Sequence, residues 1–143
     1  DVNPLGLYGY SYLDCYWTEE NRWAFFFKVN GKLAGFAMVN DYPEVEKTDY
    51  AMAEFFVLYK YRRCGLGKWA AFELFRKFQG TWQLKRHPKN IPSVHFWDKV
   101  IAEYTQGSFR LDQSCQKEAA LYPDGTRGDV FLFSTVKGPE KPG

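Results

Sequence analysis

The sequence has few cysteines, no long hydrophobic run and little net charge. Its 143 residues include three cysteines, Cys15, Cys64 and Cys115, an odd number without close spacing. That pattern argues against a disulfide framework and a zinc site, and it favours a reducing, cytoplasmic location. No apolar run approaches the roughly 20 residues that a membrane-spanning helix needs, and no secretory signal is visible. We therefore expect neither a membrane segment nor a bound metal.

The net charge of +2 is too small to favour a nucleic-acid-binding protein, which usually carries a strongly basic stripe. Basic residues instead gather in two small groups, at 60–68 and 85–89. Two local groups suit a small anionic molecule better than a polymer. Aromatic residues make up 20% of the chain, so a domain that binds nucleic acid by stacking on its bases remains an alternative interpretation. Steeply salt-dependent binding would support it.

The length allows one domain with a hydrophobic core, and no change in composition marks a linker. We expect a single domain over residues 1–137 and a flexible tail at 138–143. Residues 1–22, rich in tyrosine and acidic side chains, are expected to form a helical turn or short helix followed by a loop.

Hydrophobic patterning predicts strands at 23–29, 33–39, 50–59, 81–86, 108–114 and 129–136, with helices at 66–78 and between Asn90 and Gly107. Asn30-Gly31 predicts a hairpin between the first two strands, since both turn residues must accept positive φ. The strand–helix–strand unit must cross over right-handed, which makes its two strands parallel. The predicted fold class is α+β, a mixed and mostly antiparallel sheet with a central parallel pair and helices on both faces.

Residues 57–68 read V-L-Y-K-Y-R-R-C-G-L-G-K, so a strand runs into a glycine-rich turn that opens a helix. The first N–H groups of a helix lack internal acceptors, and the helix dipole adds partial positive charge there. Gly65 and Gly67 would let a ligand approach closely, which suits a phosphate or pyrophosphate. A plain helix start with glycine in a tight turn explains the spacing equally well. The pattern is neither a Rossmann nor a Walker motif.

At this point the sequence resembles a known family. Arg62-x-x-Gly65-x-Gly67 is similar to the R/Q-x-x-G-x-G/A signature of the GNAT N-acetyltransferase superfamily. The run from Asn90 through Ser93 to Trp97 resembles its second signature, Asn-x-x-Ala-x-x-x-Tyr, with Trp in place of Tyr. The order of elements agrees over roughly residues 23–136. The family usually opens with a strand and two helices, whereas only some 22 residues precede Trp23 here. Either a first strand lies outside this sequence or the subfamily has a shortened entry, so the acceptor side is left undefined.

The resemblance implies that the protein moves an acetyl group from acetyl-CoA to an amine by direct attack in a ternary complex, without a metal. The acceptor would be a small molecule or a peptide. The central strand would line the pantetheine arm and the turn would hold the phosphates. The implied coenzyme-binding residues are Val57, Leu58, Tyr59, Arg62, Arg63, Cys64, Gly65, Leu66, Gly67, Lys68, Asn90 and Trp97.

Glu54 is the candidate general base, because it precedes Val57 by three residues, near where family members often place an acidic residue. Aromatic surroundings would raise its pKa toward neutrality. A solvated or salt-bridged glutamate on a strand edge is the alternative. The general acid is undefined because Trp97 cannot donate a suitable proton. Tyr59, His95 and Tyr104 are weak substitutes.

A second function on the same fold is a non-catalytic acyl-CoA sensor or interaction module. Trp97 at the usual tyrosine position and the short front of the chain favour it. The tyrosines of residues 8–16 are compatible with a pocket for a cationic acceptor, together with the acids Asp14, Glu19, Glu20, Asp41 and Glu44. Core aromatic residues and solvated acids explain the same pattern at least as well. The aromatic content is compatible with a homodimer. The sequence does not identify the acceptor.

Overall fold

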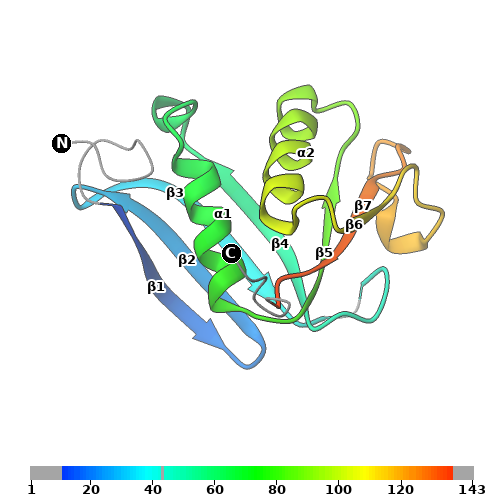
Figure 1. Ribbon diagram of the computed structural model, residues 1–143, viewed down its shortest axis with the longest axis horizontal. Coiled ribbons are helices and arrows are strands. Elements are labelled where there is room, and N and C mark those ends of the chain that lie inside the picture. The colour runs from blue at the N-terminus through cyan, green and yellow to red at the C-terminus, as the bar shows by residue number, and fades with distance from the viewer. Residues whose placement is uncertain (1–10, 43, 137–143) are drawn as a thin grey trace, which may run out of the picture.

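The computed structural model describes residues 11–42 and 44–136, which form one twisted sheet with two α-helices against it (Figure 1). The predicted tail at 138–143 lies outside the described residues, as does the first part of the segment expected to be helical. The elements are β1 (Ser11–Glu19), β2 (Arg22–Val29), β3 (Lys32–Asn40), β4 (Tyr50–Val57), the 3-10 helix η1 (Tyr59–Tyr61), α1 (Leu66–Lys77), β5 (Thr81–Arg86), α2 (Ile91–Thr105), β6 (Phe109–Asp112), the 3-10 helix η2 (Glu118–Ala120) and β7 (Asp129–Ser134).

The strands follow the order β1-β2-β3-β4-β5-β7-β6 in one sheet. Only β4 and β5 pair in parallel, and every other neighbouring pair is antiparallel. The predicted mixed sheet with a central parallel pair is therefore confirmed. The predicted hairpin is also present, with φ of 52° at Asn30 and 79° at Gly31.

The helical turn or short helix and loop predicted for residues 1–22 are wrong for the described part of that segment, because Ser11–Glu19 is a strand. β1 pairs with β2 along its whole length, and a tight turn containing Asn21, with φ of 65°, joins the two strands. The register shifts between Cys15 and Trp17. Such a bulge breaks the alternation of side chains between the two faces of a strand. The sequence therefore does not show the period of two that predicts a strand.

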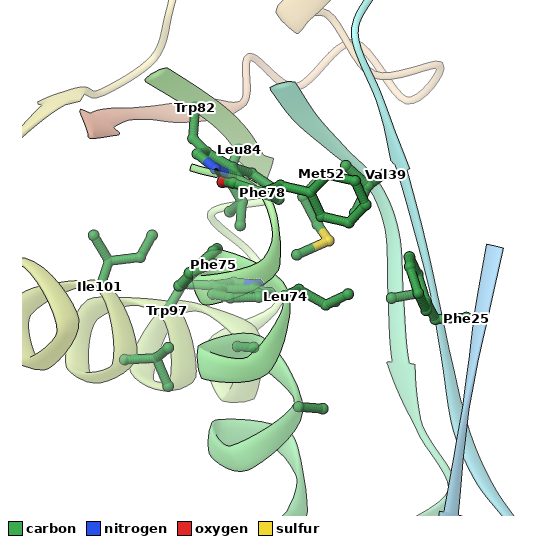
Figure 2. Packing of buried hydrophobic residues seen from close by; sticks show 14 of the residues in the cluster. Phe25, Val39, Met52, Leu74, Phe75, Phe78, Trp82, Leu84, Trp97 and Ile101 are labelled. Carbon is green, nitrogen blue, oxygen red and sulfur yellow. Dashed lines mark hydrogen bonds between the residues drawn. The ribbon is translucent and has the colours of Figure 1, made fainter. Parts of the chain in front are cut away.

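The hydrophobic core lies between the sheet and both α-helices (Figure 2). The predicted stripe of α1 is buried, and α2 adds Trp97, Val100 and Ile101. We expected helices on both faces of the sheet. Both α-helices contribute to the same core on one face, whereas the described part of the opposite face carries the short η2 and a second, small cluster around Cys115 and Val130.

β4 and β5 pair only over residues 50–52 and 82–84, and then separate. At this point β4 contains an extra residue, Ala53, which has no partner in β3 between Met52 and Glu54. A bulge of this kind bends the strand that contains it and increases the local twist. The bend accounts for the separation and leaves the following part of β4 without a strand neighbour on the β5 side.

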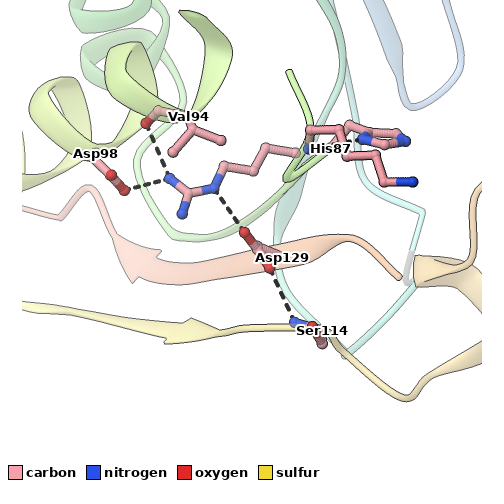
Figure 3. Close-up of polar contacts among 7 residues, drawn as sticks. His87, Val94, Asp98, Ser114 and Asp129 are labelled. Carbon is pink, nitrogen blue, oxygen red and sulfur yellow. Dashed lines mark hydrogen bonds and ion pairs between the residues drawn. The ribbon is translucent and has the colours of Figure 1, made fainter. Parts of the chain in front are cut away.

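Arg86 connects the start of α2 to the sheet next to the gap that the separation of β4 and β5 leaves (Figure 3). Its side chain is only 3% exposed, and its Nε donates to Asp129 Oδ2 at 3.2 Å. Its Nη1 donates to the carbonyl of Val94, at 3.2 Å, and to the carboxylate of Asp98. Asp129 in turn accepts the backbone N–H of Ser114 at 3.0 Å. Helix α2 and strands β5 and β7 are therefore held together by one buried guanidinium.

The loop after β6 is attached to the end of β5 through Asp124. Its carboxylate accepts the backbone N–H of Thr126 at 2.9 Å and lies 2.8 Å from His87 Nε2. The other ring nitrogen of His87 accepts the N–H of Lys89, so Nε2 carries the proton. The hydrogen bond from Thr126, followed by that from His87, lowers the pKa of Asp124 from 3.8 to about 2.

We predict that Arg86→Met lowers the free energy of unfolding by about 3–5 kcal/mol, because it leaves the carboxylate of Asp129 buried without its partner. Urea denaturation measures this loss. The control is Arg76→Met, which breaks an exposed pair with Glu73 and should cost less than about 1 kcal/mol. Equal losses in the two variants would contradict a structural role for the buried network.

We also predict that part of the acid sensitivity of the protein comes from Asp124. Its lowered pKa means that the charged carboxylate stabilises the fold above pH 3.8, and this contribution is lost as the pH falls from 3.8 toward 2. Urea denaturation between pH 5 and pH 2 should therefore show a shallower decline for Asp124→Asn than for the wild type. Identical slopes would contradict the prediction.

Candidate functional site

The turn after β4 offers a row of unpaired backbone donors. Gly65 caps α1 with a left-handed φ of 85°, and Trp69 makes the first helical hydrogen bond, donating to the Gly65 carbonyl at 3.0 Å. Within residues 11–42 and 44–136, no acceptor is paired with the backbone N–H groups of residues 63–68. The three that belong to the first turn of α1 lie where the helix dipole is positive. The segment is able to bind an anion through its backbone.

The turn itself is held in shape by its own short contacts. Tyr61 N–H donates to the Leu58 carbonyl at 2.8 Å, and Arg62 N–H donates to the Tyr59 carbonyl at 3.1 Å. Arg62 Nε also donates to the Val57 carbonyl, at 3.2 Å, while its guanidinium lies over the ring of Tyr59. Arg62 therefore fixes the turn relative to β4, a role that the signature motif alone does not indicate.

The cationic side chains around the turn differ in their freedom. Arg62 and Arg63 are exposed, and Arg63 is a non-glycine residue with positive φ, 67°. Lys68 is half-buried and forms an ion pair with Glu103 of α2, with 2.6 Å between Nζ and Oε2. Cys64 is also half-buried and donates its thiol to the Tyr61 carbonyl. Positive charge therefore surrounds the turn, although the ammonium of Lys68 already has a partner.

The two glycines of the motif are needed for different structural reasons. Gly65 adopts positive φ, which favours glycine. A Cβ on Gly67 would lie 2.8 Å from the ring of Phe96 and 3.6 Å from Val57. Gly67 therefore permits the close contact of α1 with α2 and β4, whereas the sequence suggested that it makes room for a ligand. The side chain of Leu66 is fully buried, so that residue can offer a ligand only its backbone.

The free edge of β4 points backbone groups into the gap. Leu58 N–H donates to the Ala34 carbonyl at 2.8 Å, which extends the ladder with β3. Because paired and unpaired residues alternate along an antiparallel ladder, Phe55 and Val57 direct their N–H and C=O groups away from β3. Both backbone groups of Leu58 are bonded within the protein, its carbonyl to Tyr61. Phe55 was not among the predicted coenzyme-binding residues, because this orientation depends on register.

A cleft of about 500 Å³ occupies the gap between the separating strands and is lined by residues from both faces of the sheet. On the helix side its lining includes Phe55, Leu84, Arg86, Asn90, Ser93 and Trp97. On the opposite side its lining includes Glu44, Val45, Glu54, Gln83, Lys85, His87 and Tyr122. The two sides are assigned from strand alternation: Arg86 contacts α2, whereas Gln83 and Lys85 contact loops across the sheet.

Three predicted site residues meet in this cleft. Asn90 is the N-cap of α2, where its Oδ1 accepts the N–H of Ser93 at 3.2 Å. Trp97 is 6% exposed and packs edge-on against Phe55, with 4.9 Å between ring centroids. Glu54 is exposed and lies on the opposite side of the sheet. The turn at 63–68 follows the other end of β4, so the structure places it outside the cleft lining.

The weak candidates for a general acid do not line the cleft. Tyr59 is 84% exposed and His95 is exposed on α2. Tyr104 packs against Phe72 and Phe75, and its hydroxyl is buried without a hydrogen-bond partner in the described chain. None of the three is positioned beside Glu54 and Trp97.

Tyr122 lines the cleft, although sequence reasoning missed it. Burial raises the pKa of its phenol, and the negative charges of Asp129 and then Asp124 raise it further. The hydroxyl is therefore protonated at neutral pH. No sequence signal marks Tyr122, because a loop beyond β6 brings it to the cleft. Within the described parts of the chain, no three His, Cys, Asp or Glu residues form a potential metal site, and no helix is long and apolar enough to cross a membrane.

Comparison with solved structures finds the same fold at low sequence identity. The Escherichia coli ribosomal-protein-S18-alanine N-acetyltransferase is 16% identical over 87% of this chain and 76% of its own, with a TM-score of 0.57. An acetyltransferase from Thermus thermophilus is 16% identical over 81% and 66%, with a TM-score of 0.59. The diaminobutyrate acetyltransferase of Paenibacillus lautus, solved with its substrate and coenzyme A, is 15% identical over 82% and 73%, with a TM-score of 0.57.

No curated protein sequence matches the chain significantly. The model of the acetyltransferase (GNAT) family does match, over residues 4–101, which is more than half of the chain and includes β4, the turn and most of α2. The resemblance found in the glycine turn is thereby confirmed, and the chain belongs to the GNAT acetyltransferase family.

Proposed function

We propose that this protein transfers the acetyl group of acetyl-CoA to an amine that enters the cleft between β4 and β5. The observation that carries the proposal is the presence of two free backbone segments close together in the chain. The N–H groups of residues 63–68 are unpaired, and the short 3-10 helix η1 separates them from the free edge of β4, which leads into the cleft. A long molecule with a diphosphate at one end and an amide-containing arm would find partners at both segments.

The residues present fit coenzyme A. The turn from Arg62 to Lys68 would hold the pyrophosphate, chiefly through backbone N–H groups, with Arg63 adding charge. Phe55, through its N–H and C=O, and Val57, through its N–H, would pair with the amides of the pantetheine arm, while the Val57 carbonyl already accepts Arg62 Nε. Trp97 and Asn90 line the helix side of the cleft, where the arm would end. When bound, acetyl-CoA supplies the thioester carbonyl that the amine attacks.

The amine would approach from the opposite face, where Glu54 lies. An amine must lose its proton to attack, and an exposed carboxylate at the cleft can accept that proton directly or through a water. Tyr122, protonated and on the same side, is the candidate donor to the leaving sulfur. Positioning the two substrates on either side of one gap supplies much of the acceleration, up to about 7–11 kcal/mol in favourable cases.

The non-catalytic alternative rests on Trp97, which cannot donate a proton from the position where the family usually has tyrosine. An acyl-CoA sensor would use the same turn and strand edge. The two functions differ in turnover: a sensor binds acetyl-CoA but releases no thiol with any amine. An assay of thiol release against a panel of amines therefore separates them.

We predict that acetyl-CoA at roughly a hundredfold excess over its Kd stabilises the protein by about 2.7 kcal/mol, and that Gly65→Val weakens this binding about tenfold or more. The new side chain would disturb a turn that needs positive φ. Thermal-shift titration and calorimetry measure both effects. The matched control is Gly107→Val, with φ of 84° and open surroundings away from the turn, which should cost stability without changing the Kd. Unchanged binding in Gly65→Val would refute the assigned phosphate site.

We predict that Glu54→Gln lowers kcat by about 10²-fold or more without changing the Kd of acetyl-CoA, because it removes the proton acceptor. Raising the pH should restore part of the activity, since more of the amine is then unprotonated. Glu73→Gln on α1, outside the cleft, is the control and should keep full activity. A kcat for Glu54→Gln within about twofold of the wild type would eliminate Glu54 as the base.

A further inference from the structure

The acceptor side of the cleft begins between two opposite charges. Ala51 of β4 and Gln83 of β5 are paired and point to this face. The next residues that point the same way are Glu54, displaced by the bulge, and Lys85. A carboxylate and an ammonium therefore face the start of the gap from its two walls, and Glu44 adds a second carboxylate to the lining.

These charges are not neutralised by the protein. Within residues 11–42 and 44–136, no side chain forms an ion pair with Glu44, Glu54 or Lys85. The neighbouring cation, Arg86, pairs with two carboxylates through Nε and Nη1, and both ring nitrogens of His87 are bonded, Nε2 to the carboxylate of Asp124. Lys85 is therefore the one basic residue of the described cleft lining without a carboxylate partner.

Lys85 is held in place rather than free to move into solvent. Its Nζ donates to the Ala119 carbonyl at 3.1 Å and lies over the ring of Tyr122, 4.6 Å from the centroid. Gly128 lets the loop approach closely, since a Cβ there would lie 3.0 Å from Lys85 Cγ. An ammonium has three N–H donors, so two are left for a ligand. A fixed, half-buried cation of this kind favours a bound carboxylate.

The wall that carries Glu44 is also fixed. Gln83, 4% exposed, accepts the backbone N–H of Val45 at 3.0 Å. Its Nε2 donates to Thr48 Oγ1 at 2.7 Å and to the Glu46 carbonyl. One buried amide side chain thus holds the segment after β3 against β5, which keeps Glu44 at the cleft.

We propose that the acceptor is a small amine that also carries a carboxylate, in the manner of an amino acid. Its carboxylate would face Lys85 and its amino group the carboxylates of Glu54 and Glu44. The inference rests on the proposed function and specifies its substrate class. A polyamine would place a second cation near Lys85, and a simple alkylamine would leave Lys85 without an anion.

The test compares acceptors that differ only in the carboxylate. 2,4-Diaminobutyrate is paired with 1,3-diaminopropane, and lysine with cadaverine, in assays of thiol release from acetyl-CoA. We expect kcat/KM to be at least about tenfold higher for the carboxylate-bearing member of at least one pair, mainly through KM. Lys85→Met should bring this ratio toward one, whereas Lys85→Arg should retain most of it. The control is Lys99→Met, on the exposed side of α2 and outside the cleft lining.

The outcomes separate the two proposals. Turnover of the diamines with a ratio near or below one in the wild-type protein would overturn the inference and leave the acetyltransferase function standing. A ratio that survives in Lys85→Met would also overturn it, because the carboxylate would then be recognised elsewhere. Stabilisation by acetyl-CoA without turnover of any amine would overturn the proposed function and the inference with it.

Discussion

The separation of β4 from β5 is the constraint on which the rest of the site depends. One extra residue, Ala53, bends β4 away from its parallel neighbour after three paired positions. In a continuous sheet the backbone groups of Phe55 and Val57 would be bonded to β5, and the space between the strands would be closed. The separation instead leaves a free strand edge and a cleft lined by residues of both faces of the sheet. In the proposed function, the two substrates would meet there from opposite faces of one layer.

The elements that border this gap are fixed by close packing and by buried charge. Gly67 brings α1 against Phe96 of α2 and against β4, so the helix whose N-terminus offers free donors is positioned by the same contact. Arg86 attaches the start of α2 to β5 and β7. Neither the close contact at Gly67 nor the hydrogen bonds of Arg86 contribute a reacting group. Both keep the turn, the free edge and the cleft in one arrangement, which is what positioning of two substrates requires.

The glycine turn and the acceptor face of the cleft carry different side-chain charges. Exposed arginines surround the glycine turn at one end of β4, and the acceptor face combines carboxylates with the single unpaired ammonium of Lys85. This division matches a polyanionic coenzyme on one side and an amine with its own carboxylate on the other. The buried side chain of Gln83 holds the segment that carries Glu44, whereas Glu54 and Lys85 stand on strands β4 and β5. In the proposed function, side chains at the gap would recognise the acceptor, and backbone groups of β4 and the turn would bind the coenzyme.

The sequence by itself determined the local elements and the family. Asn30-Gly31 fixed a hairpin because few residues accept its φ values, the stripe of α1 fixed a buried helix face, and the glycine turn after β4 carried the resemblance that the family match confirmed. It failed at β1, where a bulge at Tyr16 breaks the alternation that marks a strand. Only the tertiary structure placed Phe55, Lys85 and Tyr122 at the cleft. Which way a strand residue points depends on register and bulges, and a distant loop reaches a cleft only through long-range packing, so neither leaves a pattern in the neighbouring residues.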